Sequence, residues 1–146
     1  MSGIVVGIDG SEHSLQALRW AADEARTRSV PLRVVAVFTA PMMSTGYEMV
    51  APDPADLAAA TNTMLDAAID TVRASGGLAD VQVATEVLEG HAGERLIDLS
   101  GDADLLVVGA RGHGGFLGML MGSVTTHVVN HSACPVVVVR TASSDG

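Results

Sequence analysis

Two apolar patterns alternate along this chain. Short runs rich in Val, Ile and Leu predict β-strands, and longer stretches whose apolar residues recur three and four positions apart predict amphipathic helices. The strands are expected at Ile4–Ile8, Leu32–Phe38, Val81–Leu88, Asp104–Val108 and Pro135–Val139. The helices are expected from Glu12 to about Arg28, from the start signal Asp53-Pro54 to Gly76-Gly77, and over Ala92–Leu99 and Ser123–His131.

This alternation of strands and helices determines the predicted fold. Apolar strands joined by helices belong in a parallel sheet that is covered on both faces, and right-handed crossovers then give a doubly wound α/β domain. Ligands of such sheets bind beyond the carboxyl ends of the strands, where the winding direction reverses. Glycines gather directly after the first and fourth strands, so these two strands are expected to be neighbours. A five-stranded parallel sheet of order 3-2-1-4-5, in a single domain of residues 1–146 with helices on both faces, meets this condition.

Composition and charge exclude several classes of function. The chain of 146 residues has a formal net charge of -9 and 3% aromatic residues, which argues against nucleic acids and anionic membrane surfaces as partners. Its longest apolar runs, Leu105–Val108 and Pro135–Val139, are far shorter than the roughly 18 residues of a membrane-spanning helix. The start, Met1-Ser2-Gly3-Ile4, lacks the basic segment of a secretory signal, and the single cysteine, Cys134, can form no internal disulfide. We therefore expect a cytoplasmic protein.

The segment from Gly109 to Ser123 is the most unusual stretch of the chain. It holds six of the 16 glycines and lies between an apolar strand and a helix start. Glycines allow the backbone to approach a ligand closely, and a helix start offers unpaired N–H groups and a positive dipole end. The segment therefore predicts a phosphate-binding cradle, with a glycine loop that binds no ligand as the alternative.

Two common phosphate-binding motifs do not fit this segment. A P-loop requires a lysine after its last glycine, and no lysine stands at such a position. The dinucleotide fingerprint fails because Leu117 occupies the place of its last glycine, and because the first strand is followed by Gly7-Ile8-Asp9-Gly10. A different kind of phosphate-binding site is needed.

The glycine pattern resembles the ATP-binding signature of the universal stress protein family. Gly109-x-x-Gly112, nine further residues and Gly122-Ser123 follow an apolar strand and precede a helix, as in that signature. The opening Ile4–Ser11 and the ending Cys134–Val139 are also similar to that family, so the resemblance covers essentially the whole chain. It implies a site for an adenosine nucleotide, expected to be ATP with Mg²⁺, with AMP or cyclic AMP as the alternatives.

The resemblance also implies a role for each residue of the site. Asp9 would reach toward the ribose or a phosphate-bound metal, and the main chain near Val37 would meet the adenine edge. The other residues expected to contact the nucleotide are Gly10, Gly109, Arg111 and Gly112, with Gly122, Ser123 and Val124 holding the phosphates at the helix start.

Several of these residues have a simpler interpretation. Asp9 before a glycine is a common turn former, and Ser123 is a good helix N-cap. Arg111 and His113 are either phosphate contacts or exposed residues without a role. Three further histidines are interpreted as helix-surface or interface residues rather than ligands: His91, His127 and His131.

Three functions remain open from the sequence. The favoured one is an ATP-binding regulator that responds to nucleotide in the stress response; the others are a slow ATP hydrolase or nucleotidyl-transfer enzyme, and a ligand-free dimeric interaction module. Hydrolysis is expected to be slow or absent, because His113, the nearest candidate for orienting water, stands among glycines. Pro135–Val139 is expected at a sheet edge, where a homodimer would protect it from other pairing. The connection Thr39–Pro52 is expected to cover a bound base.

Overall fold

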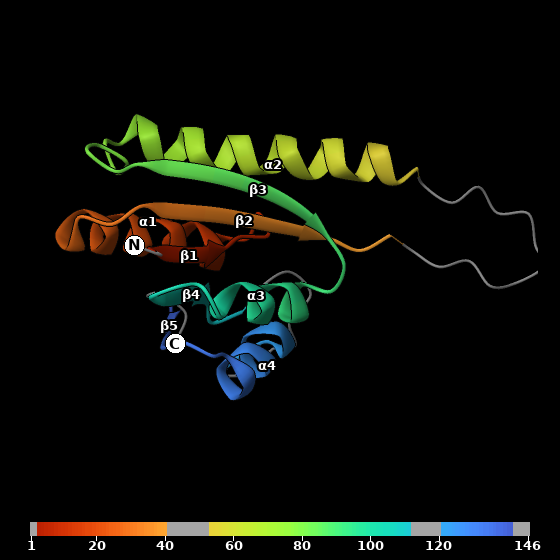
Figure 1. Ribbon diagram of the computed structural model, residues 1–146. Coiled ribbons are helices and arrows are strands. Elements are labelled where there is room, and N and C mark those ends of the chain that lie inside the picture. The colour runs from red at the N-terminus through yellow and green to blue at the C-terminus, as the bar shows by residue number, and fades with distance from the viewer. Residues whose placement is uncertain (1–2, 41–52, 112–120, 142–146) are drawn as a thin grey trace, which may run out of the picture.

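The computed structural model describes residues 3–40, 53–111 and 121–141. These residues form a parallel sheet of five strands in the order β3-β2-β1-β4-β5 (Figure 1), which confirms the predicted doubly wound α/β fold. The strands are β1 (Ile4–Gly7), β2 (Leu32–Phe38), β3 (Val83–Glu89), β4 (Leu105–Gly109) and β5 (Val136–Val139). The helices are α1 (Glu12–Arg28), α2 (Pro54–Ala74), α3 (Ala92–Ser100) and α4 (Ser123–His131).

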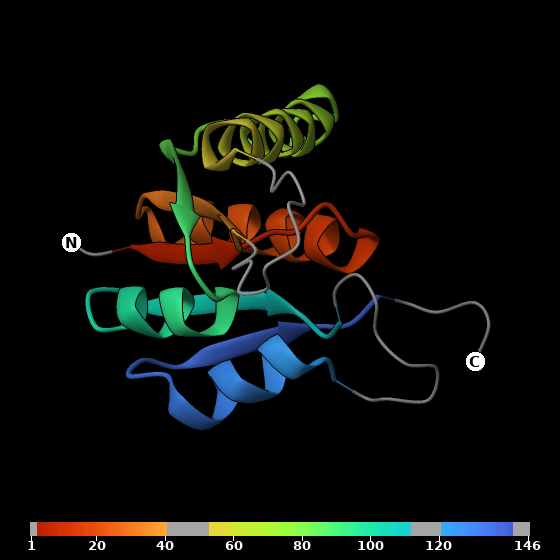
Figure 2. The same cartoon turned by 90° about the vertical axis from the view of Figure 1, so that its right-hand side faces the viewer.

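Helices cover both faces of the sheet, as the sequence predicts. α1 packs against β1 and β4, and α2 packs against β2 and β3, on one face. α3 and α4 lie beside one another on the opposite face (Figure 2). The winding direction therefore reverses between β1 and β4, whose residues pair in register from Ile4 with Leu105 onward.

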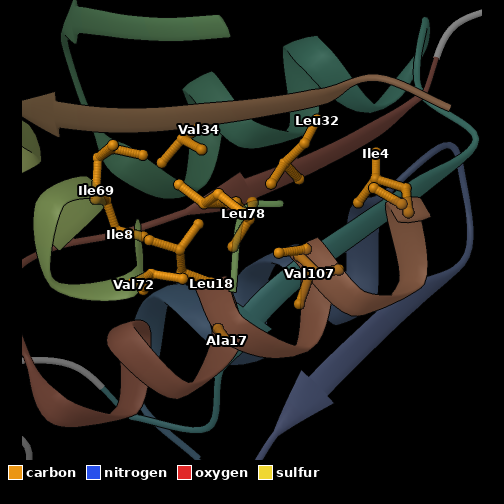
Figure 3. Close-up of a cluster of buried hydrophobic side chains, with 14 of the residues drawn as sticks. Ile4, Ile8, Ala17, Leu18, Leu32, Val34, Ile69, Val72, Leu78 and Val107 are labelled. Atoms are coloured by element: carbon orange, nitrogen blue, oxygen red, sulfur yellow. The ribbon is translucent and has the colours of Figure 1, made fainter. Parts of the chain in front are cut away.

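The two hydrophobic clusters follow from the alternation of side chains along the strands. Ile4 and Val6 point into the cluster under α1 and α2, part of which Figure 3 shows, whereas Val5 between them belongs to the cluster under α3 and α4. All three are almost fully buried. Burial of such side chains stabilises the fold by about 1.5–3 kcal/mol each. The central strands therefore hold the residues at their carboxyl ends in fixed positions.

The start of α2 confirms the signal read from Asp53-Pro54. Asp53 is the N-cap, and its carboxylate accepts a hydrogen bond from the Ala55 backbone N–H at 2.9 Å. Pro54 occupies the first turn, where its missing N–H leaves no helical bond unmade.

The two edge strands differ most from the expectation. β3 and β5 are less buried than the three central strands, because each has a neighbouring strand on one side only. β3 begins two residues later than expected, and β5 begins at Val136, although the Pro135 carbonyl still accepts a bond from the Leu106 N–H at 3.0 Å. Smaller shifts place the end of β1 at Gly7 and the end of β4 at Gly109. Among the described helices, none is long and apolar enough to cross a membrane.

Candidate functional site

The carboxyl ends of β1 and β4 lie side by side where the winding of the sheet reverses. In open α/β sheets this edge is where ligands bind. The segment after β1 contains Asp9 and Gly10, and the segment after β4 contains Arg111. The fold therefore brings together the two segments in which the sequence placed the site.

The turn after β1 holds Asp9 at this edge. Gly10 has a φ of +86°, which is the left-handed region that favours glycine. Asp9 Oδ1 accepts a hydrogen bond from the Ser11 N–H at 2.9 Å, and the Asp9 N–H donates to Ser14 Oγ at 3.2 Å. The interpretation of Asp9 as a turn former is thus confirmed. The same turn presents this exposed residue at the carboxyl edge of the sheet.

Two hydrogen bonds join the start of α4 to the end of β4. The Gly122 N–H donates to the Ala110 carbonyl at 2.8 Å, and Thr125 Oγ1 donates to the Gly109 carbonyl at 2.6 Å in a buried position. The Ala110 N–H in turn donates to the Val139 carbonyl at 2.8 Å. The first turn of α4 is therefore fixed at the carboxyl edge, one strand away from Asp9.

α4 begins at Ser123, one residue earlier than it would if Ser123 were the N-cap. Gly122 is extended, with φ −74° and ψ 169°, and is the N-cap, whereas Ser123 is already helical, so the N-cap interpretation of Ser123 is wrong. The bond from Gly122 to Ala110 holds Gly122 in the extended conformation that precedes a helix. Within the described chain, no side chain caps α4. Ser123 and Val124 are exposed at this positive end of the helix.

Gly109 has a packing role of its own. It is buried at the end of β4, and a Cβ atom placed on it would lie 2.8 Å from the carbonyl carbon and oxygen of His13. The first turn of α1 therefore approaches β4 too closely for any side chain at this position. This requirement holds with or without a ligand, and the ribose-lining role of Gly109 stays a prediction.

The Val37 main chain is directed toward the same edge. The Val35 carbonyl accepts a hydrogen bond from the Ile8 N–H at 2.9 Å, so the backbone of Val35 faces β1. Because backbone groups alternate between the two neighbouring strands, the polar atoms of Val37 face the same way. They do so beyond the last residue of β1, Gly7, which pairs with Val35. The Val37 side chain packs on the hydrophobic cluster under α3 and α4.

A groove of about 360 Å³ opens between the first turns of α3 and α4. Thr39, which follows β2, lies on its rim, where Thr39 Oγ1 donates a hydrogen bond to the Gly90 carbonyl at 2.7 Å. The groove is lined by Thr39, His91, Ala92, Gly93, Glu94, Ser123, Val124 and His127.

The two helices meet at the groove through Gly93 and His127. Gly93 is buried, and a Cβ atom placed on it would lie 2.8 Å from Cδ2 of the His127 ring. The His127 ring can therefore pack against α3 only because Gly93 has no side chain.

The structure places most of the expected residues together. Ser123 and Val124 line the groove, while Asp9 and Gly109 lie at the adjacent strand ends. Arg111 is half-buried just after β4. Three sequence expectations fall outside the described residues: Gly112, His113 and the part of the Thr39–Pro52 connection from 41 to 52.

Several groove residues were missed by the sequence reasoning. His91 and His127 were interpreted only as surface or interface residues, Glu94 was given no role, and Thr39 was considered only as the start of the Thr39–Pro52 connection. One signal was present, since Gly90-His91-x-Gly93 directly follows the third strand and so reaches the same edge of a parallel sheet.

Comparison with known proteins agrees with this architecture. The profile of the universal stress protein family matches residues 1–140. The chain belongs to the universal stress protein family. This universal stress protein is 37% identical over 142 residues to universal stress protein Rv2624c of Mycobacterium tuberculosis, and 36% identical over 146 residues to Rv2623 of the same organism. The matches cover 96% and 97% of this chain but 48% of each relative, so the chain spans about half the length of these curated relatives.

Solved universal stress proteins share the fold. One in complex with cAMP has a TM-score of 0.71 and 29% identity, and the match covers 96% of this chain and 97% of that chain. The universal stress protein from Archaeoglobus fulgidus in complex with dAMP has a TM-score of 0.66 and 25% identity, with 94% and 96% covered. UspA from Lactobacillus plantarum has a TM-score of 0.69 and 25% identity, with 94% and 97% covered.

Proposed function

We propose that this universal stress protein binds an adenosine nucleotide, ATP with Mg²⁺, at the edge formed by β1, β4 and α4, and serves as a nucleotide-responsive regulator in the cytoplasm. Two structural relatives are described as complexes with cAMP and dAMP, both adenine nucleotides. The observation that carries the proposal is the position of α4, whose first turn is bonded to the end of β4 through Gly122 and Thr125.

The phosphates bind at the first turn of α4 in this proposal. The first N–H groups of a helix have no partner within the helix and carry its positive dipole end. Ser123 and Val124 are exposed there, and Arg111 adds a positive charge after β4. Because the whole chain carries a net charge of -9, local donors rather than long-range attraction must hold a polyanion.

The base and ribose extend toward β1 and β2. The Val37 main chain is directed to the side of β1, beyond its last residue, and its N–H and carbonyl would meet the edge of a base. Asp9 lies in the turn between these groups and α1, within the region that a ribose would occupy.

Mg²⁺ would bind this edge together with the nucleotide. Across the described ranges, no three His, Cys, Asp or Glu side chains are grouped so as to hold a metal ion. Mg²⁺ is commonly bound through one or two carboxylates and the phosphates of a substrate, while it keeps several waters. Asp9 would supply the carboxylate, and the bound ion would neutralise phosphate charge.

A slow ATP hydrolase is the second candidate function. Glu94 and His127 line the same groove as Ser123, so groups able to orient water lie near the proposed phosphate position. Multiple-turnover phosphate release distinguishes the two functions. If the protein is a regulator, its ATP turnover should be far below the roughly 1–100 s⁻¹ typical of kinases. A turnover within that range that is lost in His127→Ala would favour the hydrolase.

A matched pair of substitutions on α4 tests nucleotide binding. Val124→Asp places a negative charge at the proposed phosphate position, and Val129→Asp places the same charge on an exposed residue that does not line the groove. A ligand at a hundredfold excess over its Kd stabilises the native state by about 2.7 kcal/mol. We expect Mg²⁺-ATP to stabilise the wild type and Val129→Asp but not Val124→Asp in thermal unfolding. Equal stabilisation of all three would reject the site.

The small molecule that leaves the purified protein on denaturation gives an independent test. Mass spectrometry would identify ATP, AMP or a cyclic nucleotide directly. If no nucleotide is released and none of the three stabilises the fold, the chain acts instead as a ligand-free interaction module.

We also propose a homodimer formed through Pro135–Val139. β5 lies at an edge of the sheet, and its residues are half-buried and apolar. An exposed apolar edge strand readily pairs with another strand, and a second copy of β5 is a natural partner.

A further inference from the structure

Two histidine rings lie together on α4. His127 and His131 are four residues apart, both are exposed, and their ring centroids are 4.7 Å apart. Their planes are tilted by 54°, so the rings are not stacked face to face. His127 also lines the groove, but His131 does not, so the pair extends beyond the proposed nucleotide site.

This spacing suits a shared metal ion. Histidines at positions i and i+4 of a helix present their rings on one face, as in helical zinc motifs. With Zn–N distances of about 2.0–2.1 Å and tetrahedral geometry, two imidazoles on one ion have centroids about 5 Å apart. The observed separation of the ring centroids, 4.7 Å, is close to this value.

The His127 ring is already restrained. Its Cδ2 atom lies where a side chain on Gly93 would be, so α3 borders the ring on one side. A ring that is held before binding loses less rotational freedom when the ion binds. The exposed His131 ring is open to water and hence to an arriving ion.

The charge environment also favours a cation. His131 lies in the last turn of α4, where the helix carries its negative dipole end. The chain as a whole carries a net charge of -9, which raises the local concentration of cations.

We propose that His127 and His131 form a two-histidine site for a divalent transition-metal ion of the Zn²⁺, Ni²⁺ or Cu²⁺ class. Because the described residues show no group of three possible ligands, water completes the coordination. Imidazole suits these metals, and the general affinity order places Cu²⁺ above Zn²⁺ and Ni²⁺. The site shares His127 with the groove but requires neither the strand ends nor a phosphate.

A positional swap tests the pair while keeping the composition constant. The double variant Val129→His with His131→Val keeps the number of histidines but places two of them at positions i and i+2, which do not face each other on a helix. Both exchanged positions are exposed, so the fold is expected to be retained, as circular dichroism would check.

Titration with Zn²⁺ alone, by calorimetry, gives the decisive comparison. We expect one Zn²⁺ to bind the wild type at least about tenfold more tightly than the swap variant. Equal affinity in the two proteins, or no binding to the wild type at submillimolar Zn²⁺, would overturn the proposal and leave the pair as a ring contact only.

Nuclear magnetic resonance of the imidazole nitrogens locates the ion. At substoichiometric Zn²⁺, the ring signals of His127 and His131 should change together while those of His13 and His91 stay in place. Changes confined to His13 or His91 would place the metal elsewhere and reject this site.

Discussion

Gly109 at the end of β4 lies directly against the backbone of His13 in the first turn of α1. A Cβ atom on Gly109 would be 2.8 Å from the His13 carbonyl carbon and oxygen and 2.9 Å from its Cβ. Since two of these three atoms belong to the backbone, the neighbour cannot move aside by a change of rotamer. The approach of α1 to β4 therefore depends on this glycine.

Gly109→Ala should destabilise the fold by about 1–3 kcal/mol, the usual range for overpacking. Gly101→Ala is the matched control, because that glycine has helical dihedrals and its added methyl would meet only the Asp98 carbonyl at 3.9 Å. The control should be stabilised by roughly 0.4–1 kcal/mol. Urea unfolding measures both, and a neutral Gly109→Ala would show that the close approach is not required.

Thr125→Val tests the anchor of α4. The valine keeps the shape of the side chain but removes the buried hydrogen bond of 2.6 Å to the Gly109 carbonyl. An unsatisfied buried acceptor costs about 1–3 kcal/mol, and the first turn of α4 should also lose protection from hydrogen exchange. Thr126→Val, at the exposed neighbouring position, should change stability by less than about 0.5 kcal/mol. Similar losses in the two variants would contradict this account.

Asp9→Asn distinguishes the role of Asp9 in the turn after β1 from the role of its negative charge. The asparagine oxygen can still accept the Ser11 N–H bond, so stability should be nearly unchanged. The affinity for Mg²⁺-ATP should fall about tenfold, which corresponds to the loss of roughly 1.4 kcal/mol, whereas the affinity for ATP without metal should not fall.

Asp53→Asn controls for the substitution itself. Asp53 accepts an N–H bond of 2.9 Å from Ala55 at the start of α2, a similar interaction at a position outside the proposed site. It should leave nucleotide binding unaffected with and without Mg²⁺. If Asp9→Asn weakens binding equally under both conditions, Asp9 does not hold the metal.

Val138→Pro should convert the proposed dimer into a monomer. Pro135 and Val139 face β4 with their carbonyls, which accept bonds from Leu106 and Ala110. By alternation along the strand, the Val138 N–H points to the open edge, so proline there removes an outward donor without breaking the β4 ladder. Sedimentation at micromolar concentration measures the change.

Val137→Pro is the control for the orientation of β5. Val137 pairs with Val107 and its N–H faces β4, so proline there should lower stability as well. A wild type that sediments as a monomer, with and without ATP, would remove the dimer proposal.

The fold was predictable because its determinants are local. The residues of β1 and β4 are apolar without interruption, which predicts buried strands. Asp53-Pro54 shows where α2 begins. The edge strands were less predictable, since burial of β3 and β5 depends on which neighbours the sheet provides. The switch between β1 and β4 followed from the glycines after both strands.

The site was predictable only in part. Asp9 and Ser123 stand next to strand and helix ends, where sequence patterns are informative. His127 was missed because its place depends on the distance between α3 and α4, which Gly93 allows and no local pattern reveals. The wrong cap at Ser123 has the same origin, because a bond from Gly122 to Ala110 decides where α4 begins.

Because of the hydrogen bond between Ala110 and Gly122, the position of α4 does not depend on the length of the chain between these two residues. This bond closes the connection of residues 111–121 at its base, while Thr125 holds α4 to Gly109 independently. The entropy of closing a loop grows slowly, by about 0.6 kcal/mol for each doubling of length. Insertions and deletions between these two residues therefore cost the fold little. The place of α4 at the carboxyl edge of the sheet is therefore set by Gly109, Ala110, Gly122 and Thr125, whatever the number of residues between Ala110 and Gly122.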